Sequence, residues 1–161
     1  MDIFEFAMQK EKYSEDYYRR LAGNTNQKGL REIFGMLADE EAKHYRIVEQ
    51  MKSKIPDTVS HTNILADAKE VFEKMREGAG RFDFEASQIE IYRKAQDIER
   101  DSRQFYLQKA EEVEDPARQE IFRKLADEEE KHYLLLENII QFVCRPESWL
   151  ENAEFYHLEE Y

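Results

Sequence analysis

The sequence has a single cysteine, Cys144, and few residues that break helices. One thiol cannot form an internal disulfide, and there is no closely spaced cysteine pair to hold a zinc ribbon or a four-cysteine iron site. Only 5 glycines and 3 prolines occur in 161 residues. The chain is instead rich in Glu, Lys, Leu, Ala and Arg, a composition typical of mostly helical proteins. We therefore expect an all-α fold in one domain over residues 1–161.

Positive charge and long apolar runs are also scarce. There are 24 Lys and Arg against 36 Asp and Glu, giving a formal net charge of -12. Such a surface repels phosphate backbones, so we expect no nucleic-acid partner. The N-terminal MDIFEFAMQKEKY lacks the basic start and apolar run of a signal peptide, and the most apolar stretch is interrupted by Glu137 and Asn138. We expect a cytoplasmic protein with no membrane-spanning segment.

One part of the sequence occurs twice. A shift of 88 residues, without a gap, places residues 33–45 on residues 121–133 with 10 identities in 13 positions. The same shift aligns an upstream segment, in which Ala7, Glu11, Ser14, Tyr18 and Ala22 match Ala95, Glu99, Ser102, Tyr106 and Ala110. Because the similarity covers two helical segments, the repeated unit is predicted to be a helical hairpin.

Helix caps indicate where each hairpin turns. Gly23 can end the first helix, and Asn24 can cap the next, with Gln27 three residues later as in a capping box. In the second copy, Asp115 is an N-cap followed by Pro116 at the first helical position. We predict helices near 2–22, 26–54, 84–113 and 116–143, which form one hairpin over 2–54 and another over 84–143.

Two further segments complete the predicted architecture. A crossover over 55–83 is long enough to run the length of a four-helix bundle. Its apolar residues have helical spacing, and they are Ile64, Leu65, Ala68, Val71, Phe72 and Met75. A tail over 144–161, with Trp149, Leu150, Ala153 and Tyr156, has the pattern of a short amphipathic helix. We expect it to pack on the bundle or on a second subunit.

Four glutamates and two histidines interrupt the apolar faces of these helices. Glu41 and His44 stand on the apolar stripe of the second helix, and Glu129 and His132 on that of the fourth. The first and third helices each have one glutamate among apolar residues, Glu11 and Glu99. A buried carboxylate loses several kcal/mol of solvation unless a cation or hydrogen bonds replace the water. Two histidines alone cannot compensate four carboxylates.

The spacing places these residues at one level of the bundle. In an antiparallel hairpin, residues equidistant from the turn lie side by side, and Glu11 and Glu41 bracket residue 26 while Glu99 and Glu129 bracket residue 114. Each hairpin thus brings a lone Glu opposite a Glu-x-x-His pair. Four carboxylates and two imidazoles suit two adjacent divalent transition metals. One such motif alone would more often form a surface ion pair, but two in register on apolar faces favour a dinuclear metal site.

These motifs resemble those of the ferritin-like superfamily of di-iron carboxylate proteins, and within it the rubrerythrin-like domains, over about residues 2–143. The resemblance implies a ferritin-like four-helix bundle with two iron ions per chain, or manganese or a mixed Fe/Mn centre. Carried over by position, it implies that Glu41 and Glu129 bridge the metals, that Glu11 and Glu99 are terminal ligands, and that His44 and His132 each bind one metal. Tyr18 and Tyr106 fall where the family places tyrosines near the metals. Core packing is the alternative for both.

The chain departs from the family pattern in two places. Rubrerythrins usually append a rubredoxin domain, for which this chain lacks the cysteines, so we expect electrons from an external rubredoxin-like protein or from small reductants. They also have a further Glu three residues after the lone Glu of the third helix, and this Glu exchanges with a His as the iron changes oxidation state. Ser102 occupies that position here, so the ligand set is closer to that of bacterioferritin-type centres.

Charged residues next to the predicted ligands allow two interpretations. We interpret Glu40 and Glu128 as solvent-facing members of acidic runs. The alternative is a hydrogen bond to the His of the opposite repeat, because a metal-bound His usually donates its other ring N–H to a carboxylate. Lys43 and Lys131 are interpreted as exposed partners of Asp39 and Asp127, four residues before them.

The predicted site favours a di-iron oxidoreductase of the peroxidase or ferroxidase type. It would reduce hydrogen peroxide or dioxygen, and we expect a homodimer. A metal-binding, iron-handling or sensing module without turnover, with the tail as its partner surface, is the second hypothesis. A metal-free structural bundle is the third.

Overall fold

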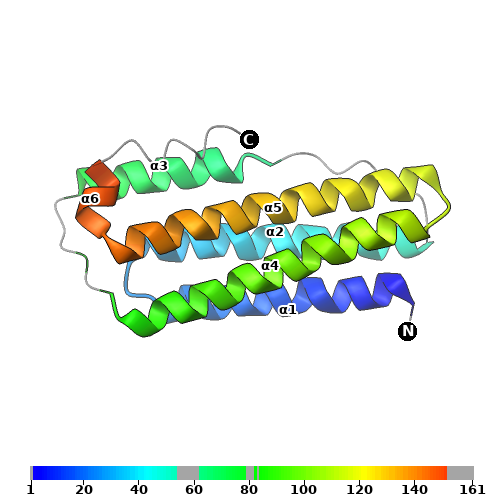
Figure 1. Cartoon of the computed structure of the whole chain (residues 1–161), viewed down its shortest axis with the longest axis horizontal. Helices are drawn as coiled ribbons and strands as arrows, with labels where there is room; N and C mark the ends of the chain where they lie inside the picture. Colours follow the sequence, from blue (N-terminus) through cyan, green and yellow to red (C-terminus); the bar gives the residue numbers. More distant parts are fainter. Residues whose placement is uncertain (1, 54–61, 79–81, 83, 152–161) are drawn as a thin grey trace.

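The computed structural model describes residues 2–53, 62–78, 82 and 84–151. Within them the chain forms six α-helices and no strand: α1 (Ile3–Asn24), α2 (Lys28–Ser53), α3 (Ile64–Glu77), α4 (Ala86–Glu112), α5 (Pro116–Cys144) and α6 (Pro146–Glu151). α1 pairs with α2 and α4 pairs with α5, and the two hairpins lie side by side with their turns at opposite ends (Figure 1). The predicted all-α bundle of two hairpins is confirmed.

The two hairpin turns differ in how their helices end. α5 begins as predicted, because the Asp115 carboxylate accepts a hydrogen bond from the backbone N–H of Ala117 at 3.0 Å. In the first turn, α1 continues through Gly23 and Asn24 to an extended Thr25, whose hydroxyl oxygen accepts from the Gln27 N–H at 3.2 Å. The predictions that Gly23 ends α1 and that Asn24 caps α2 were therefore wrong. Thr25 provides the turn acceptor, so the first helix needs no glycine terminus.

The crossover and the tail both add apolar residues to the bundle. α3 packs on α2 and α5, and its predicted apolar face is buried except for a partly exposed Met75. α6 folds back against this region, where the Trp149 ring lies 4.8 Å from that of Phe72 and 5.9 Å from that of Phe142. As far as Glu151, the tail therefore packs on the bundle. The predicted tail residues Ala153 and Tyr156 lie outside the described residues.

The apolar core is divided into two clusters by a polar layer. One cluster lies at the end that α3 and α6 cover and includes Leu37, Phe72 and Leu136. The other includes Val48 and Phe122 and lies toward the opposite end. Along every helix of the two hairpins, the sequence passes from one cluster to the other through buried Glu, Ser or His residues. The polar layer thus lies midway along the bundle.

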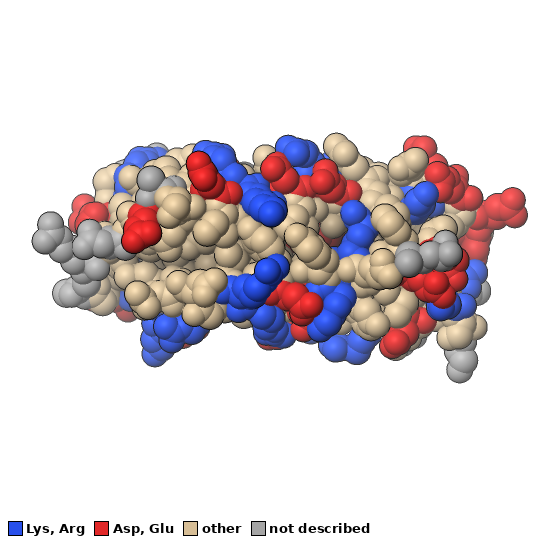
Figure 2. Space-filling view, turned by 90° about the horizontal axis from the view of Figure 1, so that it is seen from below, with Lys and Arg blue, Asp and Glu red and all other residues tan. Residues whose placement is uncertain are grey.

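The face formed by α1 and α4 has a band of uncharged side chains along its length, flanked by basic and acidic ones (Figure 2). Of the residues that the structure describes, four large apolar side chains remain more than a third exposed, namely Phe6, Tyr13, Ile91 and Leu107, and all four belong to α1 or α4. Among the described residues, no helix combines the length and the hydropathy that a bilayer span requires.

Candidate metal centre

The six predicted ligands meet in the polar layer. Each of the four bundle helices contributes to it: Glu11 from α1, Glu41 and His44 from α2, Glu99 from α4, and Glu129 and His132 from α5. The side chains are buried, with at most 2% of any residue exposed. The prediction that residues equidistant from a hairpin turn lie at the same level along the bundle therefore agrees with the structure.

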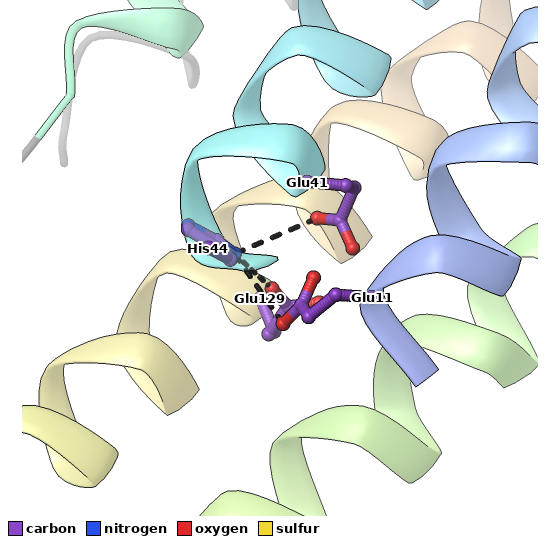
Figure 3. A group of neighbouring side chains, drawn as sticks. All are labelled: Glu11, Glu41, His44 and Glu129. Atoms are coloured by element: carbon purple, nitrogen blue, oxygen red, sulfur yellow. Dashed lines mark hydrogen bonds and ion pairs between the residues drawn. The ribbon is translucent and has the colours of Figure 1, made fainter. Parts of the chain in front are cut away.

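The donor atoms form two overlapping groups. In each group, one oxygen or nitrogen per residue lies within 4.8 Å of the others. The first group consists of Glu11, Glu41, His44 and Glu129, whose carboxylates surround the edge of the His44 ring (Figure 3). The second consists of Glu41, Glu99, Glu129 and His132. Glu41 and Glu129 belong to both groups, which is the arrangement that two neighbouring cations sharing two carboxylates require.

Both histidines direct Nδ1 into the cluster. His44 Nδ1 lies 2.7 Å from Glu129 Oε1, and His132 Nδ1 lies 2.8 Å from Glu41 Oε1. Each histidine is thus closest to the glutamate of the opposite hairpin. The two rings are nearly parallel, with centroids 5.7 Å apart. Two ligands that are each about 2.1 Å from one ion and at right angles around it lie about 3 Å apart, so these spacings suit ligands of a common ion.

The terminal glutamates are held by tyrosines of the other hairpin. The Tyr18 hydroxyl donates a 2.5 Å hydrogen bond to Glu99 Oε1, and the Tyr106 hydroxyl donates to Glu11 Oε1. Burial, followed by the charge of the adjacent glutamate, raises the pKa of both tyrosines well above the ordinary value, so they remain donors. Core packing alone does not describe them, because each one orients a carboxylate and links the two hairpins.

Several buried polar atoms in the cluster have no hydrogen-bond partner among the described residues. They are Glu11 Oε2, both oxygens of Glu41, Glu99 Oε2, Glu129 Oε2 and both ring nitrogens of His132; the 2.8 Å contact of His132 Nδ1 with Glu41 Oε1 is an ion pair and not a hydrogen bond. Buried polar atoms in native proteins are almost always satisfied, and an unpaired buried charge is especially costly. A divalent cation would satisfy carboxylate oxygens and an imidazole nitrogen together. The residues therefore fit a metal site.

The electrostatics of the cluster favour protons when no cation is present. Burial, and then repulsion from Glu11 and Glu99, raises the pKa of Glu41 well above the ordinary value. Burial, and then the charge of Glu41, does the same for Glu129. Burial alone would lower the pKa of His132, but Glu99 and then Glu40 outweigh it and raise the pKa well above the ordinary value. A metal must therefore displace protons when it binds.

We expect the metal-free protein to lose stability as the pH rises from about 5.5 to about 8. Glu41, Glu129 and His132 have raised pKa values in the folded state, so the folded protein binds more protons than the unfolded chain above the ordinary values of 4.5 and 6.5. The free energy of unfolding must then fall with pH in this window. Urea unfolding in the presence of a chelator measures it. A metal-free protein that becomes more stable over this range would contradict the expectation.

The lowered pKa values do not change this sign. Burial opposes ionisation of Glu99, but the charge of His132 lowers its pKa below the ordinary value. Burial likewise opposes ionisation of Glu40, but His132 and Thr62 lower its pKa to about 2. The stability that these two groups provide is complete above about pH 4.5 and is lost only as the pH falls below it.

The interpretation of Glu40 and Glu128 as solvent-facing was wrong. Glu40 is 5% exposed, and its Oε1 lies 3.6 Å from Nε2 of His132, the histidine of the opposite repeat that the alternative named, which is an ion-pair distance rather than a hydrogen bond. Glu128 is fully buried, but its Oε1 accepts from the Thr62 N–H at 2.8 Å and its Oε2 lies 2.7 Å from Lys131 Nζ. Thr62 belongs to the crossover. Its contact with α5 buries a side chain that the helix pattern alone places at the surface.

The predicted pairings of Lys43 and Lys131 were also wrong. Lys131 is 6% exposed and pairs with Glu128 rather than with Asp127. Lys43 is exposed, but it lies 3.9 Å from Glu40, and Asp39 pairs instead with Arg19 of α1 at 2.7 Å. The i,i+4 rule ignores neighbouring helices, and these helices provided closer partners.

Ser102, at the position of the additional rubrerythrin glutamate, is 4% exposed. It lines a groove of about 340 Å³ between α1 and α4 whose other lining residues are Phe6, Gln9, Lys10, Tyr13, Ile98 and Asp101. Ser102 also follows Glu99 by one helical turn and precedes Tyr106 by another, on the same helix face. This small residue thus lies between the groove and the polar layer.

Comparison with known proteins supports the resemblance deduced from the motifs. A scan against protein-family models matches residues 2–140 to rubrerythrin, a range that contains all six candidate ligands and both tyrosines. Neither the curated proteins nor the solved structures gave a significant match. The match spans most of the sequence, from α1 into the second half of α5. The chain belongs to the rubrerythrin family, whose domain is a ferritin-like di-iron bundle.

Proposed function

We propose that this protein is a non-haem di-iron oxidoreductase that reduces hydrogen peroxide or dioxygen. The observation that supports it is the pair of donor groups that share Glu41 and Glu129 in a buried layer with unpartnered carboxylate oxygens. Each group has three carboxylates and one imidazole, a donor set that suits iron or manganese. Glu11 and His44 complete one position, and Glu99 and His132 complete the other.

Two ferrous ions at this site would supply two electrons, which with two protons reduce one hydrogen peroxide to two water molecules. The protein's part is to bind and orient. Four carboxylates offset the cationic charge, Tyr18 and Tyr106 fix the terminal glutamates, and the two apolar clusters exclude bulk water from the layer. Electrons for re-reduction would come from an external rubredoxin-like donor or a small reductant, since the single Cys144 cannot form a rubredoxin iron site.

The test is an anaerobic ferrous titration of metal-free protein, followed by addition of peroxide. We expect a break near two irons per chain and oxidation of both irons by one equivalent of peroxide. Glu41→Ala should abolish both results. A break near two irons without peroxide or dioxygen turnover would instead support the metal-binding or sensing module. The described tail does not favour that module, because Trp149 and Leu150 are buried in the bundle core.

The tyrosine hydroxyls provide a finer test of the ligand roles. Tyr18→Phe and Tyr106→Phe each remove a hydrogen bond to a terminal glutamate but keep the ring that fills the core. Loss of an outer hydrogen bond to a ligand typically weakens metal binding by about 10–100-fold. Isothermal titration with a divalent metal should therefore show weaker binding in each variant. Tyr92→Phe is the control, since Tyr92 is buried but is neither a candidate ligand nor bonded to one. Unchanged affinity in both test variants would leave the tyrosines a packing role only.

The groove above Ser102 is the proposed entrance for the oxidant. Ser102→Leu should slow oxidation of the ferrous protein by peroxide several-fold, while metal stoichiometry stays the same, because the larger side chain fills the floor of the groove. Ser14→Leu is the matched control. Ser14 is the repeat counterpart of Ser102 and equally buried, but it is not among the groove's lining residues. Stopped-flow oxidation rates compare the two, and equal slowing would indicate a packing effect instead.

A further inference from the structure

The two halves of the candidate metal centre differ outside the ligand set. The 88-residue shift places Glu40 on Glu128 and Lys43 on Lys131. If the halves were equivalent, each of these glutamates would face the outer nitrogen of one histidine. The structure instead gives the two glutamates different partners.

Glu40 and His132 are directed at each other. His132 directs Nδ1 into the cluster, and its outer nitrogen, Nε2, lies 3.6 Å from Glu40 Oε1. Neither of these two atoms has a hydrogen-bond partner among the described residues. When Nδ1 binds a metal, the ring proton must reside on Nε2, and Glu40 is the adjacent acceptor for it. Lys43 does not compete strongly, since it is exposed and 3.9 Å from the other Glu40 oxygen.

Glu128 is engaged elsewhere. Its Oε1 accepts a hydrogen bond from the Thr62 N–H at 2.8 Å, and its Oε2 forms an ion pair with the buried Lys131 ammonium at 2.7 Å. In the part of the chain that the structure describes, no carboxylate lies within ion-pair distance of His44 Nε2. A single crossover connects the two hairpins, and the one backbone N–H of its Thr62 is donated to Glu128, while the Thr62 side chain lies near Glu40. The asymmetry therefore follows from the topology.

We infer that the two metal positions are inequivalent, and that Glu40 is a positioning residue that makes the position at Glu99 and His132 the tighter one. A carboxylate that accepts the outer N–H of a ligand histidine fixes the ring and strengthens its donation to the metal, an effect of about 10–100-fold in affinity. Glu40 also adds negative charge beside that position, whereas the charge of its repeat counterpart Glu128 is neutralised by Lys131. The inference rests on the dinuclear site proposed above.

The experiment is an anaerobic titration of metal-free protein with cobalt(II), followed by its visible absorption. Two binding steps are expected, with dissociation constants at least about tenfold apart. Glu40→Gln should weaken the tight step by about 10–100-fold and leave the weak step in place. Glu99→Gln should remove the tight step and Glu11→Gln the weak step, which assigns each step to a position.

The matched control is the pair of changes Glu128→Gln and Lys131→Met in one variant. It removes the counterpart carboxylate and also the ammonium that would otherwise be left unpaired in the interior. Its tight step should match that of the unmodified protein. Two equal steps in the unmodified protein, or equal weakening by the control and by Glu40→Gln, would overturn the inference while the dinuclear site remains. No cobalt binding, or binding that Glu41→Gln does not weaken, would overturn the dinuclear site itself.

Discussion

Removing the metal is expected to lower the melting temperature of the loaded protein by about 8–16 °C. A ligand that binds only the folded state at 1,000 times its dissociation constant adds about 4 kcal/mol of stability. For a chain of this size, each kcal/mol corresponds to about 2–4 °C. The structural reason is the set of carboxylate oxygens in the polar layer that lack hydrogen-bond partners. Calorimetry with and without a chelator, at pH 7, measures the difference.

The control for this experiment is a glutamate outside the layer. Glu49 is on α2, as Glu41 is, but it is exposed. Glu49→Gln should therefore lose as much melting temperature on chelation as the unmodified protein does. An unchanged melting temperature after chelation of the unmodified protein would contradict the metal site and support a metal-free structural bundle.

Glu41→Gln is expected to change stability in opposite directions with and without metal. In the metal-free protein the amide removes an acidic group whose pKa is raised by burial and by Glu11 and Glu99. A buried acid whose pKa is raised destabilises the folded state above its ordinary pKa, so the uncharged amide should make the metal-free protein more stable at neutral pH. The gain should be larger at pH 8 than at pH 5.5, because the free-energy cost of a raised pKa grows as the pH rises above the ordinary value of 4.5. With metal present the same change removes an oxygen that both donor groups share.

The loaded Glu41→Gln variant should therefore lose the two-metal stoichiometry, the metal-dependent rise in melting temperature and peroxide turnover. Glu129→Gln should behave in the same way, because Glu129 belongs to both donor groups and also has a raised pKa. Urea unfolding of the chelated variants and ferrous titration measure the two effects separately. A Glu41→Gln variant that keeps iron-dependent peroxide reduction would contradict the bridging role.

The sequence was sufficient for the bundle and the six candidate ligands because both follow from local regularities. Helical spacing places Glu41 and His44 on a buried face, and equal distance from a turn places Glu11 beside Glu41. The repeat then supplies the second half without further information. Each of these arguments uses only the geometry of one hairpin, and that geometry does not depend on the rest of the fold.

What the sequence could not provide depends on contacts between hairpins and with the crossover. Tyr18 follows Glu11 by two helical turns, yet its hydroxyl binds Glu99, because α1 and α4 are antiparallel and bring that residue level with it. The burial of Glu128 and Lys131 depends on Thr62, which is distant in sequence. Helix periodicity describes one helix at a time, so it cannot predict that a residue on an exposed helix face is buried by the crossover.

The division of the apolar core into two clusters has a consequence for local unfolding. Helices usually open first at their ends, where amides lack partners, and stay closed in the middle. Here each end of the bundle is held by an apolar cluster, while the middle holds like-charged or protonated carboxylates. Without a cation, amide hydrogens around Glu41 and Glu129 should therefore exchange with solvent sooner than their central place in α2 and α5 implies. Metal binding should therefore slow amide exchange most in the middle of α2 and α5, rather than at the helix ends.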